Sequence, residues 1–506
     1  MGARPACIVD HARARPAARA LAMSDGTETL TFAALEARSR ALAGQIGAAG
    51  CAPGDHVAIL IENRADFMVA LWGCHRAGVH YTPVNWHLSS AEAAYIVRDC
   101  GARLILSSSG LAALATEASG GGELWLCPGD GPSGFARIDG EVPPAAASPE
   151  REGAAMLYSS GTSGQPKGIK RALSGERFGA WSASDEMMRA LYDFGPHTVL
   201  LCPAPLYHAA PMNFSMSAQR AGGRVILMPS FDAEQALQAI EREQATAAWL
   251  VPTMMIRLLQ LDPARRAQAK LGSLTHIVHA GAPCPVEVKR RMMEWMGPIL
   301  HEFYGATEGN GFTAIGPQEW LAHPGSVGRS DAVRIVGEDG MVLGPGEVGL
   351  VYFATSWVPF EYHNDPAKTA GAIDARGWST LGDIGFVDAD GYLFLTDRKS
   401  HMIISGGVNI YPQEVENLLA SHPLVADSAV IGVPDADLGE AVKAVVVLHD
   451  PGLATPRTET EIIGYCRARL ARFKCPRSVD FVDTLPRMPT GKLLKRLLRD
   501  RYWPPA

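Results

Sequence analysis

The feature that most constrains this chain is a glycine-rich stretch from Tyr158 to Gly168, with the sequence YSSGTSGQPKG. Its glycines allow backbone conformations that other residues avoid, so successive N–H groups can point at a single anion. Its hydroxyl groups add hydrogen-bond donors, and Lys167 adds a mobile positive charge. The stretch therefore predicts a loop that binds the phosphates of a nucleotide.

This loop differs from the common Walker A phosphate loop. The Walker motif requires G-x-x-x-x-G-K-[ST], whereas here Lys167 follows Pro166 and precedes Gly168. The sequence therefore indicates another nucleotide chemistry. For the stretch taken alone, the alternative interpretation is a flexible surface loop, because clusters of Gly, Ser and Thr are typical of such loops.

Length and composition narrow the function classes. The 506 residues exceed one ordinary core, so at least two domains are expected. The net charge of −7 argues against nucleic acid as a partner. The nine cysteines show neither a C-x-x-C pair nor zinc-ligand spacing, which is typical of a reducing cytoplasm. No run approaches 18 uninterrupted apolar residues, so we expect a soluble cytoplasmic protein without an integral membrane segment.

The first third of the chain alternates between strand and helix patterns, which predicts a largely parallel sheet covered by helices. The expected elements are a helix capped by Thr31, strand 57–61, helix 65–77, strand 79–84, a helix after Ser89 and strand 103–107. Residues 118–153 are rich in Gly, Pro and Ala and predict a long irregular connection to the phosphate loop.

The same alternation returns beyond the loop. The expected elements are strands 199–202, 224–228, 247–251 and 276–279, with a helix at 233–243. Residues that directly follow the carboxyl ends of parallel strands line ligand crevices. We therefore expect His208, Gly281 and the segment 302–308 to converge on one cleft.

The last part of the chain changes character twice. Short strands with Gly/Asp turns between residues 325 and 395 predict a β-rich subdomain. After Lys399, helix and strand patterns predict an independent α+β domain of about a hundred residues. The expected fold class is α/β, with a large domain of mostly parallel sheets, the β-rich subdomain and a small α+β C-terminal domain.

Five segments in fixed order carry a resemblance to a known family. They are the glycine-rich stretch, Pro205-Leu-Tyr-His208, Glu302-Phe-Tyr-Gly-Ala-Thr-Glu308, Gly382-Asp383 with Asp397-Arg398-Lys399, and Pro489-Thr-Gly-Lys492. Together they resemble the adenylate-forming superfamily, which includes acyl-CoA synthetases, luciferases and the adenylation domains of peptide synthetases. The resemblance covers nearly the whole chain. It implies an AMP-binding adenylation domain at residues 1–397 and a mobile C-terminal domain at residues 398–506.

The resemblance implies a site for ATP and AMP. Asp383 matches the acid that binds both ribose hydroxyls, a role that suits a carboxylate. The other nucleotide-binding positions it implies are Ser159, Ser160, Gly161, Thr162, Ser163, Gly164, Lys167, Gly281, Ala282, Pro283, Glu302, Phe303, Tyr304, Gly305, Thr307 and Arg398. Among these, Glu302 and Tyr304 match positions that contact the edge and the face of the adenine ring.

Catalytic roles are also implied by the resemblance. Glu308 and Thr162 match the ligands of Mg²⁺, an ion that prefers hard oxygen donors. Glu308 is expected as an exposed metal ligand that contributes little to folding. Lys492 matches a catalytic lysine that stabilises negative charge during attack on the α-phosphate, and His208 joins the catalytic set. Lys399 matches the hinge about which the small domain rotates.

The acceptor is expected to be coenzyme A. Ser405, Gly406 and Gly407 match a segment that admits the pantetheine thiol, and glycine lets a narrow arm pass close to the backbone. Phe473, Lys474 and Arg477 match positions at the nucleotide end of coenzyme A. No Gly-x-Asp-Ser phosphopantetheine site is visible in the sequence, and no carrier-protein domain is expected after Ala506.

The acid is expected to be hydrophobic. Residues 206–212 lack the Asp with which amino-acid-activating relatives pair a substrate amine. Gly305 stands where acetate-specific relatives place a Trp, so the pocket should extend beyond two carbons. The expected lining, which with Phe303 suits fatty, aryl and steroid-like acids alike, is His208, Met212, Phe214, Ala280, Gly305 and Ala306.

The sequence thus favours an ATP-dependent carboxylic acid:CoA ligase that forms AMP and pyrophosphate, with Mg²⁺ as cofactor and ATP, CoA and a small acid as partners. Two alternatives stay open. One is an adenylating enzyme that loads a stand-alone acyl carrier protein, and the other is a non-catalytic acyl- or nucleotide-binding paralogue. Retention of Lys167, Glu308, Asp383, Arg398 and Lys492 argues against the paralogue. The oligomeric state is open, with a homodimer as one expectation.

Overall fold

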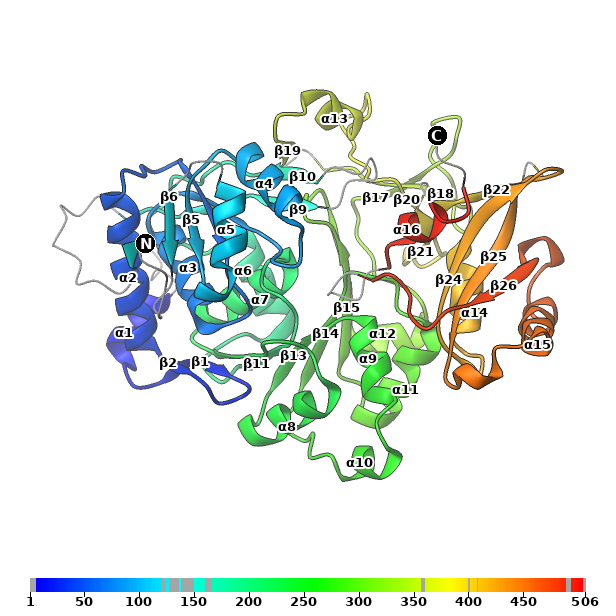
Figure 1. The fold of residues 1–506 in the computed structure, drawn as a ribbon, viewed down its shortest axis with the longest axis horizontal. Coiled ribbons are helices and arrows are strands. Elements are labelled where there is room, and N and C mark those ends of the chain that lie inside the picture. Colours follow the sequence, from blue (N-terminus) through cyan, green and yellow to red (C-terminus); the bar gives the residue numbers. More distant parts are fainter. Residues whose placement is uncertain are drawn as a thin grey trace.

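The computed structural model describes residues 6–119, 123–126, 136–137, 150–159, 166–355, 360–398, 401–406, 408–487 and 493–503. A six-stranded and an eight-stranded sheet, both packed against helices, form the larger part of the molecule (Figure 1). The C-terminal elements, coloured orange to red, lie at the opposite end from the N-terminal helices (Figure 1). The predicted α/β fold class is confirmed.

The six-stranded sheet has the order β7-β6-β5-β3-β4-β8, and all of its pairs are parallel. Its strands are β3 (His56–Leu60), β4 (His80–Pro83), β5 (Ala102–Ser107), β6 (Glu123–Leu126), β7 (Ala136–Arg137) and β8 (Ala154–Ala155). The helices that accompany it are α2 (Phe32–Ala48), α3 (Ala65–Arg76), α4 (Ser90–Asp99) and α5 (Ala112–Ser119).

Along these strands, successive side chains point to opposite faces of the sheet, which explains why helices cover both faces. Val57 and Ile59 of β3 belong to the large core that includes apolar residues of α2 and α3. Ala58 and Leu60, the residues between and after them, pack instead with α4 and α5. Because side chains alternate across a strand, a continuous apolar run buries both faces of the sheet.

One expectation for this region was wrong. The connection predicted as irregular between residues 118 and 153 contains β6 and β7, which extend the sheet from β5. The reason is that the short apolar run Leu124-Trp125-Leu126 lies within Gly- and Pro-rich sequence, so the average composition of the segment concealed a strand.

The eight-stranded sheet has the order β16-β15-β14-β13-β11-β12-β1-β2. Its strands are β1 (Arg19–Met23), β2 (Thr29–Thr31), β11 (Val199–Cys202), β12 (Arg224–Leu227), β13 (Ala247–Leu250), β14 (His276–His279), β15 (Leu300–Gly305) and β16 (Phe312–Ile315). Since β11, β13, β14 and β15 are mutually parallel, their carboxyl ends meet at one edge. The segments that follow these strands therefore begin at the same edge of the sheet, while the predicted cleft that includes His208 stays a prediction.

Further helices accompany this second sheet along the chain. They are α1 (Ile8–Ala14), α6 (Ala183–Tyr192), α7 (Ala209–Arg220), α8 (Ala233–Glu243), α9 (Pro252–Leu259), α10 (Pro263–Gln268), α11 (Val286–Met296) and α12 (Pro317–Ala322). Several ends follow from local sequence: Asp232, for example, caps α8 by accepting a hydrogen bond from the backbone N–H of Gln235 at 2.9 Å. Among the helices that the structure describes, none is both long and apolar enough to cross a membrane.

Two small antiparallel sheets follow. The first consists of β9 (Leu157–Ser159), β10 (Lys167–Lys170) and β19 (Glu361–Tyr362). The second consists of β17 (Val333–Val336), β18 (Gly349–Phe353), β20 (Asp383–Val387) and β21 (Leu393–Arg398), and α13 (Pro366–Gly371) lies between β19 and β20 in sequence. Ser159 pairs with Lys167, so β9 and β10 form the two sides of a hairpin that carries the glycine-rich stretch.

The C-terminal part has its own sheet and its own apolar cores. Its strands are β22 (Ile403–Ser405), β23 (Val408–Ile410), β24 (Val425–Asp435), β25 (Gly439–Leu448) and β26 (Ser478–Phe481). Its helices are α14 (Pro412–Leu419), α15 (Pro456–Arg467) and α16 (Lys495–Arg499). The domain boundary between residues 397 and 398, near the end of β21, stays a prediction.

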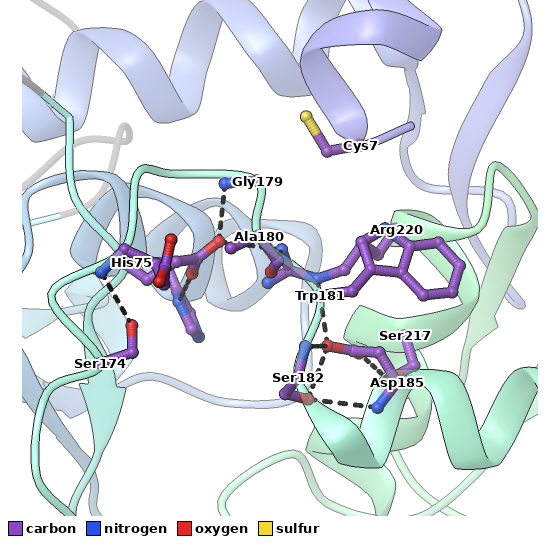
Figure 2. Close-up of polar contacts among 12 residues, drawn as sticks. Cys7, His75, Ser174, Gly179, Ala180, Trp181, Ser182, Asp185, Ser217 and Arg220 are labelled. Carbon is purple, nitrogen blue, oxygen red and sulfur yellow. Dashed lines mark hydrogen bonds and ion pairs between the residues drawn. The ribbon is translucent and has the colours of Figure 1, made fainter. Parts of the chain in front are cut away.

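A buried polar network links the chain before β9 to the chain after β10, and Figure 2 shows Gly179, Ala180 and Arg220 of this network. Glu152, which precedes β9, accepts hydrogen bonds from the Gly179 backbone N–H at 2.6 Å and from Arg220 at 2.9 Å. Arg220 also donates to the carbonyl oxygen of Ala180 at 2.7 Å. Burial raises the pKa of Glu152, but the hydrogen bond from His75 and the charges of His75 and Arg220 outweigh it and lower the pKa to about 2. The network therefore joins the chain before β9 to the chain after β10.

Two stacked histidines, of which His80 is buried and His56 is half-buried, predict acid sensitivity. His56 and His80 stack at 4.8 Å between ring centroids, and burial, with the nearby charge of Lys170, lowers the pKa of each to about 4. Between pH 6.5 and 4 the unfolded chain binds protons at these rings and the folded chain does not, so stability falls as the pH falls through this window. We expect the free energy of unfolding to decrease by on the order of 1–3 kcal/mol per histidine by pH 4.

Urea denaturation at pH 7.5, 6.0 and 5.0 measures this effect. In His80→Gln the decrease between pH 7.5 and 5.0 should be smaller than in the wild type, since one of the two rings no longer titrates. An equal pH dependence in both proteins would contradict the assignment of the acid sensitivity to this pair.

Candidate active site

A cleft of about 860 Å³ lies between the carboxyl edge of the eight-stranded sheet and the C-terminal unit. The residues on the large-domain side include Pro252, Thr253, Gly281, Ala282, Pro283, Glu302, Phe303, Tyr304, Gly305 and Asp383. Those on the C-terminal side include Gln413, Glu416, Asn417, Asp427, Arg487, Leu493 and Lys495. The structure therefore brings the predicted adenine and ribose residues to one cleft.

Backbone geometry forms one wall of this cleft. Gly281 follows β14 with φ +86°, a conformation that favours glycine, and Ala282 and Pro283 continue the wall. Gly382 has φ +82° and leads directly into β20 at Asp383. The Oη atom of Tyr304 donates a hydrogen bond to Oδ2 of Asp383 at 2.6 Å, so the predicted adenine-face and ribose residues are in direct contact.

Strand β15 contributes several residues to the site. Glu302 and Tyr304 lie on one face of this strand and line the cleft together with Asp383. Phe303 lies between them in sequence, so its side chain points to the other face, where it stacks on Phe214 of α7 with ring centroids 5.8 Å apart. Phe303 and Gly305 also line the cleft, so β15 brings predicted nucleotide residues and predicted acyl residues to the same site.

The acyl side is apolar and closely packed. Met212, Phe214 and Ala280 are all buried. Phe303 also stacks on Phe312, at 5.4 Å between ring centroids. His208 is the N-cap residue of α7, the helix that carries Met212 and Phe214. Of the other predicted lining residues, Ala306 is half-buried and Gly305 is exposed at the end of β15.

Lys167 and Glu308 meet around an aromatic ring that sequence analysis did not identify. The Nζ atom of Lys167 lies 5.2 Å from the centre of the Tyr362 ring, and Tyr362 donates a hydrogen bond from Oη to Oε1 of Glu308 at 2.9 Å. Burial and the charge of Lys368 lower the pKa of Lys167, while the charge of Glu308 acts in the opposite direction. The backbone carbonyl of Thr307 accepts a hydrogen bond from Arg171 at 3.1 Å.

The expectation that Glu308 is exposed was wrong. Only 8% of this residue is accessible, and its carboxylate is the acceptor for Tyr362. The sequence showed a Thr-Glu pair in a loop but gave no sign of Tyr362, which comes from β19 far along the chain. The hard carboxylate oxygens of Glu308 fit Mg²⁺, an ion that would neutralise phosphate charge when bound.

Two substitutions separate the structural and the metal-binding roles of Glu308. Glu308→Gln keeps an oxygen acceptor for Tyr362, so we expect a melting temperature within a few degrees of the wild type but a loss on the order of 10²-fold in Mg²⁺-dependent turnover. Glu308→Ala leaves the Tyr362 hydroxyl unpaired and should lower the melting temperature as well. Thermal melting and a Mg²⁺ titration of activity measure both effects. A Gln variant with wild-type turnover would contradict the metal-binding role.

Asp397, near the end of β21, links the large domain to the first helix of the C-terminal part. Its Oδ2 accepts a hydrogen bond from the backbone N–H of Gln413 in the first turn of α14 at 3.1 Å, an interaction that suits a carboxylate at a helix N-terminus. The backbone of Arg398 pairs with Asp383 across β20 and β21. Arg487 and Leu493 form a bridge with each other, and both line the cleft. The chain on each side of the Pro489–Lys492 motif therefore reaches the cleft.

The structure does not bring the described coenzyme A candidates to this cleft. Ser405 and Gly406 lie at the end of β22, and neither belongs to the cleft lining. Phe473 is 53% exposed. Lys474 pairs with Glu414 at 2.6 Å, and Arg477 pairs with Asp435 at 3.3 Å. In this arrangement the two cations are matched by carboxylates of their own domain.

Several predicted residues lie outside the described part of the chain. They are Ser160, Gly161, Thr162, Ser163, Gly164, Lys399, Gly407 and Lys492. Their roles stay predictions. Ser159 is described at the end of β9, opposite Lys167.

Sequence analysis also missed two lysine–glutamate pairs around the cleft. Lys289 of α11 contacts Glu302 at 2.7 Å, and Lys495 of α16 contacts Glu416 of α14 at 2.8 Å. Both lysines are buried. Amphipathic spacing could have placed Lys289 on the inner face of its helix, but no pattern in the sequence pairs it with a strand residue.

Comparisons with known proteins agree with this geometry. The family model for AMP-binding enzymes matches residues 8–363, and the model for the C-terminal domain of AMP-binding enzymes matches residues 414–492. A feruloyl-CoA synthase from Amycolatopsis sp is 34% identical over 97% of this chain and 97% of its own length. The fatty acid–[acyl-carrier-protein] ligase ScoC from Streptomyces coeruleorubidus is 32% identical over 97% of this chain and 95% of its own length.

A solved structure extends the likeness to three dimensions. The o-succinylbenzoate CoA synthetase from Bacillus subtilis, in complex with its acyl-adenylate intermediate, superposes with a TM-score of 0.82 at 28% identity, covering 98% of each chain. Two family models that together span most of the chain, with relatives similar over nearly their whole length, establish the assignment. The chain belongs to the family of AMP-binding enzymes, within the adenylate-forming superfamily.

Proposed function

We propose that this protein is an ATP-dependent carboxylic acid:CoA ligase, which activates a hydrophobic acid as an acyl-adenylate and transfers the acyl group to coenzyme A. The observation that carries the proposal is the cleft in which Gly281, Glu302, Tyr304 and Asp383 lie opposite Arg487 and Leu493. The first four match a nucleotide site, and the last two flank the motif that contains Lys492.

In the proposed first step, a carboxylate oxygen of the acid attacks the α-phosphorus of ATP and pyrophosphate leaves. The adenine ring lies between the Gly281 wall and Tyr304, and Asp383 accepts hydrogen bonds from the ribose hydroxyls. Lys492 balances the negative charge that develops at the α-phosphate, an effect of about 3–4 kcal/mol for one preorganised donor. Glu308 and Thr162 would hold Mg²⁺, which neutralises phosphate charge.

In the proposed second step, the thiolate of coenzyme A attacks the acyl carbon of the adenylate and AMP leaves. Because Ser405 and Gly406 lie away from the cleft in this structure, the small domain must rotate before they can admit the thiol. The present arrangement therefore corresponds to the adenylation step. Lys474 and Arg477 must exchange their carboxylate partners for phosphates of coenzyme A during that rotation.

The acid is proposed to be fatty, aryl or steroid-like. Phe214, Phe303 and Phe312 form a stacked aromatic wall beside buried Met212, which suits an apolar substituent. Two of the similar proteins, the feruloyl-CoA synthase and the o-succinylbenzoate CoA synthetase, bear names that refer to aromatic acids.

A carrier protein is the second candidate acceptor, because ScoC is named for transfer to an acyl carrier protein. Free coenzyme A is favoured by the exposed Phe473 beside two cations, Lys474 and Arg477, which suits a purine ring with phosphates.

The deciding assay supplies ATP, Mg²⁺ and a panel of short, medium, long, aryl and steroid acids, with either coenzyme A or a phosphopantetheinylated carrier protein. For the preferred acid, we expect AMP and a thioester to form at least about 100-fold faster with coenzyme A than with the carrier protein. Thioester formation with the carrier protein alone would overturn the choice of acceptor. Formation of ADP in place of AMP would overturn the reaction itself.

A further inference from the structure

A buried ion pair lies directly behind the adenine part of the cleft. The Nζ atom of Lys289 donates to Oε2 of Glu302 at 2.7 Å, and the side chains are 0% and 8% accessible, respectively. Lys289 comes from α11 and Glu302 from the middle of β15, so the pair joins the helix to the strand. Glu302 lines the cleft.

Packing around Lys289 leaves little freedom to its ammonium group. The Nζ atom lies 4.8 Å from the ring centre of Trp320, which is itself buried, so an aromatic face covers one side of the cation. The side chain of Lys289 is therefore directed at the Glu302 carboxylate by the surrounding structure.

The other titratable groups near Glu302 do not replace this charge. His279 lies 3.5 Å from Oε2 of Glu302, but burial and the charge of Lys289 lower the pKa of His279 well below its usual value, so this ring is neutral at pH 7. Burial raises the pKa of the Cys284 thiol, which is therefore also neutral. Among the described groups that face Glu302, Lys289 supplies the positive charge.

Ionisation of Glu302 depends on this partner. Burial raises the pKa of Glu302 above its ordinary value, and the charge and hydrogen bond of Lys289 offset part of this increase. Without the lysine, a carboxyl group at this depth would take up a proton, because an unpaired buried charge is strongly unfavourable.

A purely structural role explains the pair less well. A buried ion pair often gives no more stability than apolar residues of similar volume, since the desolvation penalty offsets the attraction. Methionine at 289 with leucine at 302 would serve packing equally well. What an apolar pair lacks is an ionised acceptor at the cleft surface.

We infer that Lys289 is a positioning residue, which keeps the Glu302 carboxylate ionised and directed at the exocyclic amino group of adenine. This inference rests on the proposed nucleotide site. An ionised carboxylate only accepts hydrogen bonds, so it favours the 6-amino group of ATP and repels the 6-oxo group of ITP. The pair would thus determine which purine nucleotide the enzyme accepts.

The test measures dissociation constants of ATP and ITP by calorimetry, without acid or coenzyme A, for the full-length wild type and for Lys289→Met. We expect the wild type to bind ATP on the order of 10²-fold more tightly than ITP, because rejection of an analogue that leaves buried polar groups unmatched is strong. In Lys289→Met a protonated Glu302 can donate to the oxo group. The ratio of the ATP and ITP affinities should therefore fall at least about tenfold.

A matched control and a second variant keep the outcomes distinct. Arg290 lies on the same helix, is exposed and pairs with Glu287 at 2.8 Å, so Arg290→Met should keep the wild-type ratio. If Lys289→Met does not fold, the double variant Lys289→Met/Glu302→Gln replaces the ion pair by neutral groups of similar size. Its glutamine amide both donates and accepts, so ATP and ITP should bind within a few-fold of each other.

The results separate this inference from the proposed function. A wild-type ratio in both Lys289→Met and the double variant, with only a lower melting temperature, would make the pair purely structural and overturn the inference. Absence of ATP binding by the wild type would overturn the proposed function instead. A lower ratio in Lys289→Met together with an unchanged ratio in Arg290→Met supports the inference.

Discussion

Lys492→Ala should lose on the order of 10²–10³-fold in the rate of acyl-adenylate formation and should largely keep thioester formation from supplied acyl-AMP. The reason is that the proposed lysine charge acts at the α-phosphate only before the small domain rotates. Arg487 and Leu493, on either side of the motif, line the cleft, which agrees with a role for this segment in the adenylation arrangement.

The two half-reactions are measured separately by rapid quench, as pyrophosphate release from ATP and as thioester formation from synthetic acyl-AMP. Arg496→Ala is the matched control, because Arg496 is an exposed cation of α16 close to Lys492 in sequence. We expect this control to keep both rates. Equal losses of both half-reactions in Lys492→Ala would contradict the proposed division between the two steps.

Lys399→Pro should also have a large effect, but on thioester formation instead of adenylation. If the small domain rotates about this residue, its φ and ψ angles must change widely while each domain stays rigid. Proline fixes φ near −65° and removes the backbone N–H, so it should trap one arrangement. If ATP binding selects the adenylation arrangement, as we propose, first-turnover pyrophosphate release should survive, while thioester formation should fall by orders of magnitude.

Lys399→Ala is the control for this variant, because it removes the charge but leaves the backbone free. The adjoining segment shows what rotation would have to change: Asp397 accepts a hydrogen bond from the backbone N–H of Gln413 in the first turn of α14, and this contact would have to break. An ordinary linker lysine in a rigid two-domain enzyme predicts that both steps change together or not at all. Normal thioester formation in Lys399→Pro would exclude rotation about this residue.

Much of the fold could be predicted because local pattern and tertiary environment agree. Strands β11 and β14 and helix α8 have the predicted bounds, since apolar runs and an Asp cap mark them without ambiguity. The strand β6 was missed because its apolar run is short and surrounded by Gly and Pro. Its pairing with β5 depends on a neighbour that the local sequence does not reveal.

In the candidate site, too, some residues could be predicted from the sequence and their contact partners could not. Motifs identified Glu302, Tyr304 and Asp383, and the structure brings these residues to one cleft. The partners that set their chemistry were not predictable. Lys289 reaches Glu302 from a helix, and Tyr362 reaches Glu308 from a distant strand, so both contacts exist only after the chain has folded.

The central claim is that this chain joins ATP and a carboxylic acid into an acyl-adenylate before any thiol takes part. The most direct test is the exchange of labelled pyrophosphate into ATP with Mg²⁺ and the preferred acid, in the complete absence of coenzyme A. The account predicts exchange that requires the acid, and its inhibition when coenzyme A is added, because the adenylate then proceeds to the thioester. Exchange that is independent of the acid, or that appears only when coenzyme A is present, would contradict the account.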